Sequence, residues 1–165
     1  MKLYLLRHGS AADMASSDAE RELTREGEEE AQIVGSALAE LGVKPSHILS
    51  SPLVRARQTA EIAAQALKVR GAVESLDELA NGTPTQALLR ALNPYSSEDE
   101  ILLVGHMPSL AEHLAALIGS KSPQGLALGK ACIACVGLDE LRPGRGQLRW
   151  LLRQKQLRCI AESKA

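Results

Sequence analysis

Four side chains that can bind or accept a phosphoryl group follow the ends of three apolar runs. Arg7 and His8 follow the first run, Arg55 comes shortly after the second, and His106 follows the last of the three. A guanidinium matches phosphate oxygens with a planar fork, and a neutral imidazole can attack phosphorus. Because ligands in open α/β sheets bind beyond the carboxyl ends of the strands, we expect these side chains to meet, with His8 taking up a phosphoryl group.

The elements that must position these side chains alternate along the chain between apolar runs typical of buried strands and segments of helical period. The predicted strands cover residues 3–6, 47–50, 72–76, 101–104, 132–138 and 147–152, and the predicted helices cover residues 24–41, 53–67, 84–92 and 108–118. This order predicts an α/β fold, a three-layer α/β/α sandwich whose mostly parallel sheet ends in an antiparallel edge. We expect a single domain over residues 1–165, with a polar tail from about residue 153 that is frayed or lies on the surface.

The start of the second predicted helix carries an electrostatic anomaly. Ser51 and Pro52 are a suitable N-cap and first helical residue, but Arg55 and Arg57 stand in the first turn. Cations at a helix N-terminus are unfavourable unless an anion offsets them. The anomaly therefore predicts an anion near Arg55, whereas we interpret Arg57 as solvated or ion-paired.

Composition narrows the function classes. The net charge of −1 and the aromatic content of 2% argue against nucleic-acid binding, which needs a basic field and stacking platforms. No apolar run is long enough to cross a bilayer, and the chain enters the charged segment at Arg7 with no signal peptide, so we expect a cytoplasmic protein. Cys132 and Cys135 are spaced for opposite faces of a strand, and we interpret them as core residues, not metal ligands.

Several sequence blocks occur together in a fixed order. They are Leu6-Arg7-His8-Gly9, then Leu23-Thr24 with Gly27, then Ser51-Pro52-Leu53-Val54-Arg55-Ala56-Arg57-Gln58-Thr59-Ala60, and Gly105-His106-Met107-Pro108. In this order they resemble the signature blocks of the histidine phosphatase superfamily, the phosphoglycerate mutase-like group. The short chain and the last block resemble most the SixA-type phosphohistidine phosphatases within it.

The resemblance implies a role for each member of the quartet. His8 would be the nucleophile that becomes phosphohistidine, and Arg7 and Arg55 would clamp the equatorial oxygens of the phosphoryl group. His106, protonated, would add a third donor. The resemblance implies no metal and no other cofactor. It implies as partner a histidine-phosphorylated protein, either a phosphotransfer domain or a phosphocarrier, and we expect the enzyme itself to be a monomer.

Departures from the superfamily pattern leave the general acid open. Acid phosphatases of the superfamily carry an aspartate where this chain has Met107, and other members supply a glutamate from a region where this chain offers Asp77 and Glu78. For each of them, two interpretations stay open: the general acid and a solvated loop carboxylate. An acid-poor site favours phosphohistidine as substrate, because imidazole leaves readily. The alternatives are a small-molecule phosphomonoesterase that uses Glu78 or Asp77, and a phosphate-recognition module without turnover.

Three further residues have weaker signals. Ser10 could donate a hydrogen bond to phosphate or be an ordinary turn serine. His47 and His113 are both predicted to lie on the surface.

Overall fold

The computed structural model describes residues 1–163 and contains one sheet of six strands. The strands are β1 (Lys2–Arg7), β2 (His47–Ser50), β3 (Glu74–Ser75), β4 (Glu100–Gly105), β5 (Ile133–Leu138) and β6 (Gly146–Leu152). Their spatial order is β3-β2-β4-β1-β5-β6. The first four in this order are parallel, whereas β5 runs antiparallel to β1 and β6 antiparallel to β5. The predicted parallel sheet with an antiparallel edge is confirmed.

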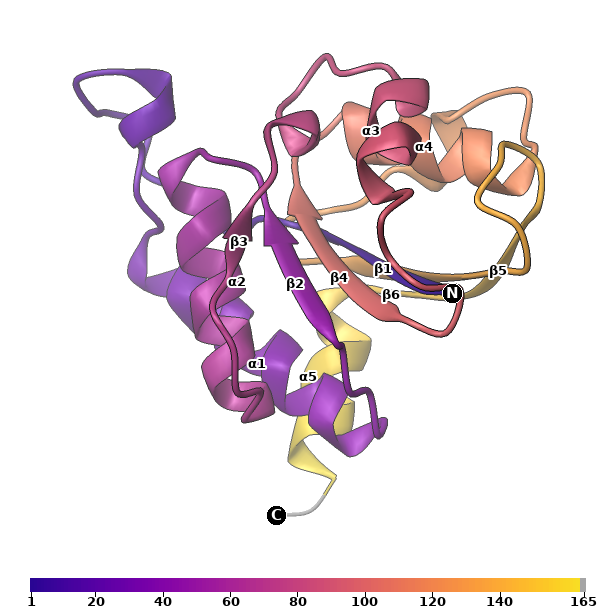
Figure 1. The fold of residues 1–165 in the computed structure, drawn as a ribbon. Helices are drawn as coiled ribbons and strands as arrows, with labels where there is room; N and C mark the ends of the chain where they lie inside the picture. The colour runs from indigo at the N-terminus through magenta and orange to yellow at the C-terminus, as the bar shows by residue number, and fades with distance from the viewer. Residues whose placement is uncertain (164–165) are drawn as a thin grey trace.

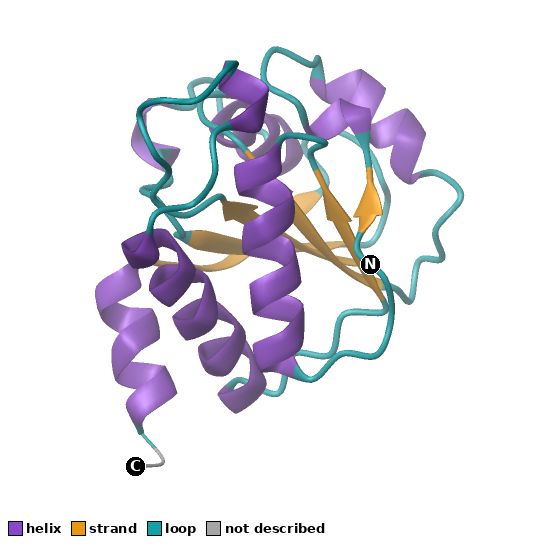
Figure 2. Ribbon diagram, turned by 90° about the vertical axis from the view of Figure 1, so that its left-hand side faces the viewer, coloured by secondary structure: helices purple, strands orange, loops and turns teal. Residues whose placement is uncertain are grey.

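Helices cover both faces of the sheet, as Figures 1 and 2 show. The helices are α1 (Arg25–Glu40), α2 (Val54–Leu67), α3 (Thr85–Leu92), α4 (Ser109–Ile118) and α5 (Gln154–Glu162), with short 3-10 turns η1 (Asp18–Glu20), η2 (Asp77–Leu79) and η3 (Gln124–Leu126). Leu3 and Leu5 of β1 lie in the core beneath α3 and α4, whereas Tyr4 and Leu6 pack toward α1, α2 and α5. Because successive strand residues point to opposite faces, β1 joins both cores and is buried on both sides.

The helix starts show which local signals hold. Thr24 is the N-cap of α1, and its hydroxyl accepts a hydrogen bond from Gly27 N at 3.1 Å, as predicted. The predicted N-cap of α2 is wrong, since that helix begins at Val54, one residue after the predicted start, and has Leu53 as its N-cap. Ser51 is therefore outside the helix, and its hydroxyl serves a tertiary contact described below.

Three other expectations need correction. The described part of the polar tail is not frayed: residues 154–162 form α5, which lies on the surface with Leu157 fully buried against the core that α1 covers. His113 is not on the surface but is 1% exposed, because it shares the buried face of α4 with Leu110 and Leu114. The third strand is shorter than predicted, two residues at the sheet edge.

The expectation that the two cysteines of the fifth strand region are core residues agrees with the structure. Cys132 and Cys135 are free, buried thiols that belong to the cores on opposite sides of the sheet. Within residues 1–163, no helix is long and apolar enough to cross a membrane.

Candidate active site

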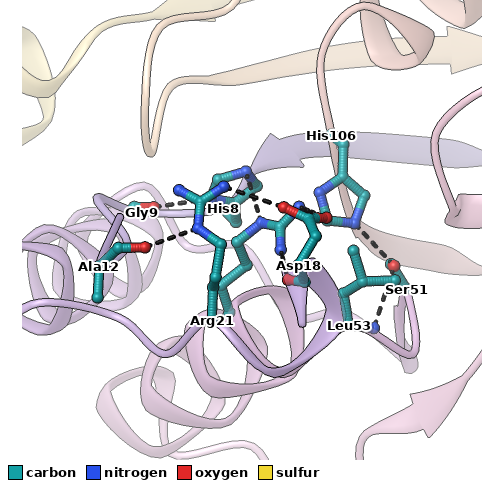
Figure 3. A network of polar contacts seen from close by, with 9 residues as sticks. His8, Gly9, Ala12, Asp18, Arg21, Ser51, Leu53 and His106 are labelled. Atoms are coloured by element: carbon teal, nitrogen blue, oxygen red, sulfur yellow. Dashed lines mark hydrogen bonds and ion pairs between the residues drawn. The ribbon is translucent and has the colours of Figure 1, made fainter. Parts of the chain in front are cut away.

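The carboxyl ends of three neighbouring parallel strands bring the predicted quartet together. His8 follows β1, His106 follows β4, and Arg55 lies in the first turn of α2 after β2. The imidazole ring centroids of His8 and His106 are 5.1 Å apart, and Arg55 Nε donates to His8 Nε2 at 3.4 Å. Figure 3 shows the two imidazoles in this cluster. The convergence predicted from the strand ends is therefore present.

Two glycines allow the chain after β1 to approach α1 closely. A Cβ added at Gly9 would lie 2.7 Å from the carbonyl oxygen of Gly27. A Cβ added at Gly27 would lie 2.0 Å from the carbonyl oxygen of Ser10. Side chains larger than hydrogen would push the two segments apart. The close approach places Gly9 against the first turn of α1, and Gly9 N donates to Thr59 Oγ1 of α2 at 3.1 Å, so the neighbouring His8 lies beside α2.

Hydrogen bonds assign the tautomer of His8. Its Nδ1 lies 2.7 Å from the carbonyl oxygen of Gly9, which can only accept, so Nδ1 carries the proton. Nε2 is then an unprotonated acceptor that faces Arg55. Burial, together with the positive charges of Arg55 and Arg7, lowers the pKa of His8 to about 4 against the opposing effect of the Gly9 carbonyl. At neutral pH, His8 is thus a neutral imidazole with its Nε2 lone pair available as a nucleophile.

His106 differs from the expectation of a protonated side chain. Burial, together with His8 and Arg55, lowers its pKa to about 3, so it is neutral in this structure. Its Nε2 lies 2.8 Å from the hydroxyl oxygen of Ser51, which explains the position of Ser51 outside α2. Its buried Nδ1 has no hydrogen-bond partner among the described residues. The positive charge of Arg55, which adds to burial in keeping His106 neutral, would also attract an anion.

Arg55 is buried and is held by a residue that the sequence did not single out. Its Nη1 donates to the carbonyl oxygen of Asp18 at 2.7 Å, and its Nη2 donates to Asp18 Oδ2 at 3.1 Å. The other carboxylate oxygen of Asp18 accepts from Arg21 Nη1 at 3.0 Å, and Arg21 Nε donates to the carbonyl oxygen of Ala12 at 2.6 Å (Figure 3). The electrostatic anomaly at the start of α2 is thus offset by an anion from the protein itself.

Sequence reasoning missed Asp18 and Arg21 because they lie in a polar segment far from any strand end. The segment from residue 10 to residue 22 has the composition of an ordinary surface loop. The one signal was the position of Arg21, two residues before the Leu23-Thr24 block.

Arg7 and Ser10 are engaged differently from the prediction. Arg7 Nη1 donates to the carbonyl oxygen of Leu128 at 2.9 Å, and its buried Nε has no partner among the described residues. Burial lowers the pKa of Arg7, so its charge is poorly solvated and available to an anion. The backbone N–H and hydroxyl of Ser10 both donate to the carboxylate of Glu30, at 2.7 and 3.1 Å. Ser10 is therefore tied to α1.

The two acidic candidates lie on η2, which adjoins the site without contacting the quartet. Asp77 is exposed and Glu78 is half-buried, and within residues 1–163 neither makes a hydrogen bond or ion pair with the quartet. The turn itself is close, because the carbonyl oxygen of Leu79 lies 3.1 Å from a Cβ placed on Gly105. Arg57 makes an exposed ion pair with Glu61 at 3.2 Å, as predicted. Met107 packs against the α3–α4 core.

Comparison with known proteins defines the class. Residues 3–88 match the model of the histidine phosphatase superfamily (branch 1). The chain is 30% identical to the phosphohistidine phosphatase SixA of Escherichia coli over 152 residues, which cover 91% of this chain and 92% of that protein. It is 37% identical over 153 residues to an uncharacterized protein of Picosynechococcus, covering 90% of this chain and 89% of that one. The structure of the protein histidine phosphatase SixA complexed with tungstate superposes with a TM-score of 0.87 at 30% identity, covering 95% and 99% of the two chains.

These similarities establish that the chain belongs to the histidine phosphatase superfamily. It is a phosphatase, a hydrolase whose class uses a catalytic histidine. Within the described part of the chain, no group of three His, Cys, Asp or Glu side chains is arranged to hold a metal ion.

Proposed function

We propose that this protein is a phosphohistidine phosphatase that removes phosphate from a histidine-phosphorylated protein through a phosphohistidine formed on His8. The observation that carries the proposal is the state of His8. Its proton is held on Nδ1 by the Gly9 carbonyl, and its Nε2 is neutral and faces Arg55. Similarity to SixA, a phosphohistidine phosphatase, over nearly the whole chain supports the substrate class.

The first step transfers the phosphoryl group between two imidazoles. Nε2 of His8 attacks phosphorus, the P–N bond of the substrate breaks, and the leaving imidazole takes a proton from solvent. Arg7 and Arg55 stabilise the charge on the three equatorial oxygens. His106 lies on the opposite side of the site, and the dianion would raise its pKa, so that it becomes a third hydrogen-bond donor.

The second step is hydrolysis of the phosphoenzyme. Water attacks phosphorus, the P–N bond to His8 breaks, and inorganic phosphate leaves with His8 neutral again. Both steps expel an imidazole. Because the conjugate acid of imidazole titrates near ~6.5, neither step needs a strong protein acid at neutral pH.

The state of Asp18 also favours phosphohistidine. Asp18 is the carboxylate that binds Arg55, and its hydrogen bonds to Arg21 and Arg55 lower its pKa. An ionised carboxylate cannot protonate the alkoxide that leaves from a phosphomonoester. A phosphohistidine protein, presented from its own surface by a phosphotransfer domain or a phosphocarrier, makes no such demand, and we expect the enzyme to act on it as a monomer.

A small-molecule phosphomonoesterase is the second candidate, and the position of η2 favours it. The turn packs on Gly105, directly before His106, so Asp77 and Glu78 lie on the element next to that histidine. Under this second candidate, Glu78→Gln or Asp77→Asn would lower monoester turnover by about 100-fold or more. Under our proposal, neither substitution changes hydrolysis of a phosphohistidine protein by more than a few fold.

A substrate panel tests the proposal directly. The protein is assayed on a phosphohistidine phosphotransfer domain, on p-nitrophenyl phosphate and on a sugar phosphate. We expect preference for the phosphohistidine protein, and we expect radiolabel from it to be trapped on the enzyme in an acid-labile, base-stable form that His8→Ala abolishes. Preference for the sugar phosphate would support the second candidate. Phosphate binding without turnover of any substrate would indicate a recognition module.

A further inference from the structure

The loop between β1 and α1 is fixed at its base and exposed at its tip. Ala11 and Leu23 form an antiparallel bridge, and Ala12 N donates to the carbonyl oxygen of Glu22 at 2.8 Å. Residues 13–20, by contrast, are all exposed. Figure 1 shows this tip as a projection beyond the amino end of α2. Such a loop can move at its tip while its base stays in place.

The tip carries an anion into a cluster of cations. The Arg55 side chain is 9% exposed, whereas the Asp18 side chain that binds it is 66% exposed. The same carboxylate joins Arg55 to Arg21, whose guanidinium also lowers the pKa of His8. The buried arginine cannot leave the site, but its exposed partner can.

The contacts of Asp18 are those that a phosphoryl group needs. Nε of Arg55 faces Nε2 of His8, the atom that would attack phosphorus, so a phosphoryl group at His8 lies against Arg55. Both remaining nitrogens of that guanidinium already donate to Asp18. Carboxylate and phosphate are alternative ligands for a guanidinium fork, and two anions side by side repel each other.

We propose that Asp18 is an internal counter-ion that the substrate's phosphoryl group displaces from Arg55 and Arg21. On displacement, the tip of the loop moves outward and Arg21 becomes a further cation for the phosphate. After hydrolysis, the carboxylate returns and competes with the inorganic phosphate product, which helps that product to leave. This inference rests on the proposed phosphate site and adds to it the residue that sets its affinity for anions.

Asp18→Asn tests the competition while keeping the shape of the side chain. The backbone carbonyl that binds Arg55 remains, and the amide oxygen can still accept a hydrogen bond. The substitution removes the negative charge of Asp18 from its partly exposed ion pairs with Arg55 and Arg21. Binding of inorganic phosphate should therefore tighten by roughly threefold to tenfold. The dissociation constant is measured by calorimetry on the intact protein at fixed ionic strength, and product inhibition by phosphate should strengthen by the same factor.

Asp13→Asn is the matched control, because Asp13 is an exposed aspartate of the same loop and its replacement changes the net charge equally. It should leave the dissociation constant for phosphate unchanged. Equal tightening in both variants would reduce the effect to overall charge and overturn the inference. Arg21→Ala should weaken phosphate binding, and Asp18→Asn should have a smaller effect in that background, since one of its two partners is gone.

The remaining outcomes are also decisive. Unchanged phosphate binding in Asp18→Asn overturns the inference. Weaker binding with slower turnover also overturns it, and would make Asp18 a residue that positions Arg55. If the wild-type protein hydrolyses the phosphohistidine protein but Asp18→Asn is no tighter, only this inference fails. If the wild-type protein neither binds phosphate nor hydrolyses any substrate, the proposed function fails and the inference fails with it.

Discussion

Two regions of this molecule bury histidine, and they differ in what surrounds the ring. At the carboxyl ends of β1 and β4, His8 and His106 lie beside Arg55. Between α3 and α4, His113 accepts or donates one hydrogen bond with Thr85 Oγ1 at 2.8 Å, and burial is the sole cause that lowers its pKa to about 4. All three histidines are buried with depressed pKa values. Burial alone therefore does not mark function, whereas cations gathered around an oriented ring do.

The largest expected difference between the two regions appears in turnover when each histidine is replaced by asparagine. His8→Asn should lower hydrolysis of a phosphohistidine protein by about 1,000-fold or more, because the nucleophile is lost. His113→Asn should change turnover by no more than a few fold, since its ring has no contact with the site. The initial rates of purified, folded variants decide the matter, and comparable losses in both would mean that His113 belongs to the catalytic apparatus.

Replacing Arg55 tests whether the cation beside His8 and His106 is needed for catalysis. Arg55→Ala should lower kcat by about 100- to 1,000-fold, because a preorganised charge at the phosphoryl oxygens is lost. Arg55→Lys keeps the charge but not the fork and should recover only part of that loss. Arg57 lies two residues further along α2 and makes an exposed ion pair. Arg57→Ala removes that pair and serves as the control. A fully active Arg55→Lys would contradict the importance of the fork.

The interior histidine should be visible in stability and not in catalysis. The pKa of His113 is about 4 in the folded protein, against 6.5 for a free imidazole, so the unfolded chain binds its proton more tightly. Its contribution to stability is complete above pH 6.5 and is lost as the pH falls toward 4, on the order of 3 kcal/mol in all. Urea unfolding of His113→Leu between those pH values should show a shallower loss. An unchanged slope would show that other groups dominate acid unfolding.

The smallest expected effect comes from removing the hydrogen bond between Ser51 and His106. Ser51→Ala removes the hydroxyl 2.8 Å from His106 Nε2 and should lower kcat/KM by about 2- to 10-fold, the range of one hydrogen bond. Ser46→Ala, at an exposed serine before β2, is the control and should leave kcat/KM unchanged. A loss as large as that of Arg55→Ala would show that Ser51 acts on the phosphoryl group itself.

Much of the fold and the quartet could be predicted because their signals are local. An apolar run followed at once by Arg7-His8, or by Gly105-His106, is visible in the sequence, and parallel strands must align their carboxyl ends. The cation in the first turn of α2 was likewise visible as an electrostatic anomaly. The amino-acid sequence by itself therefore determined which strands carry the chemically capable residues at their ends, the class of fold and the fact that these residues cluster.

Only the tertiary structure decided which side chains complete that arrangement. Asp18 and Arg21 join the site because a loop folds over α2, and Ser51 turns from a helix cap into a partner of His106. The neutral state of His106 depends on its burial beside the cation of Arg55. The docking of α5 through Leu157 depends on a surface that α1 provides. Apart from the local pair of Asp18 and Arg21, the determining contacts join residues distant in sequence, and a contact of that kind has no local pattern from which it could be predicted.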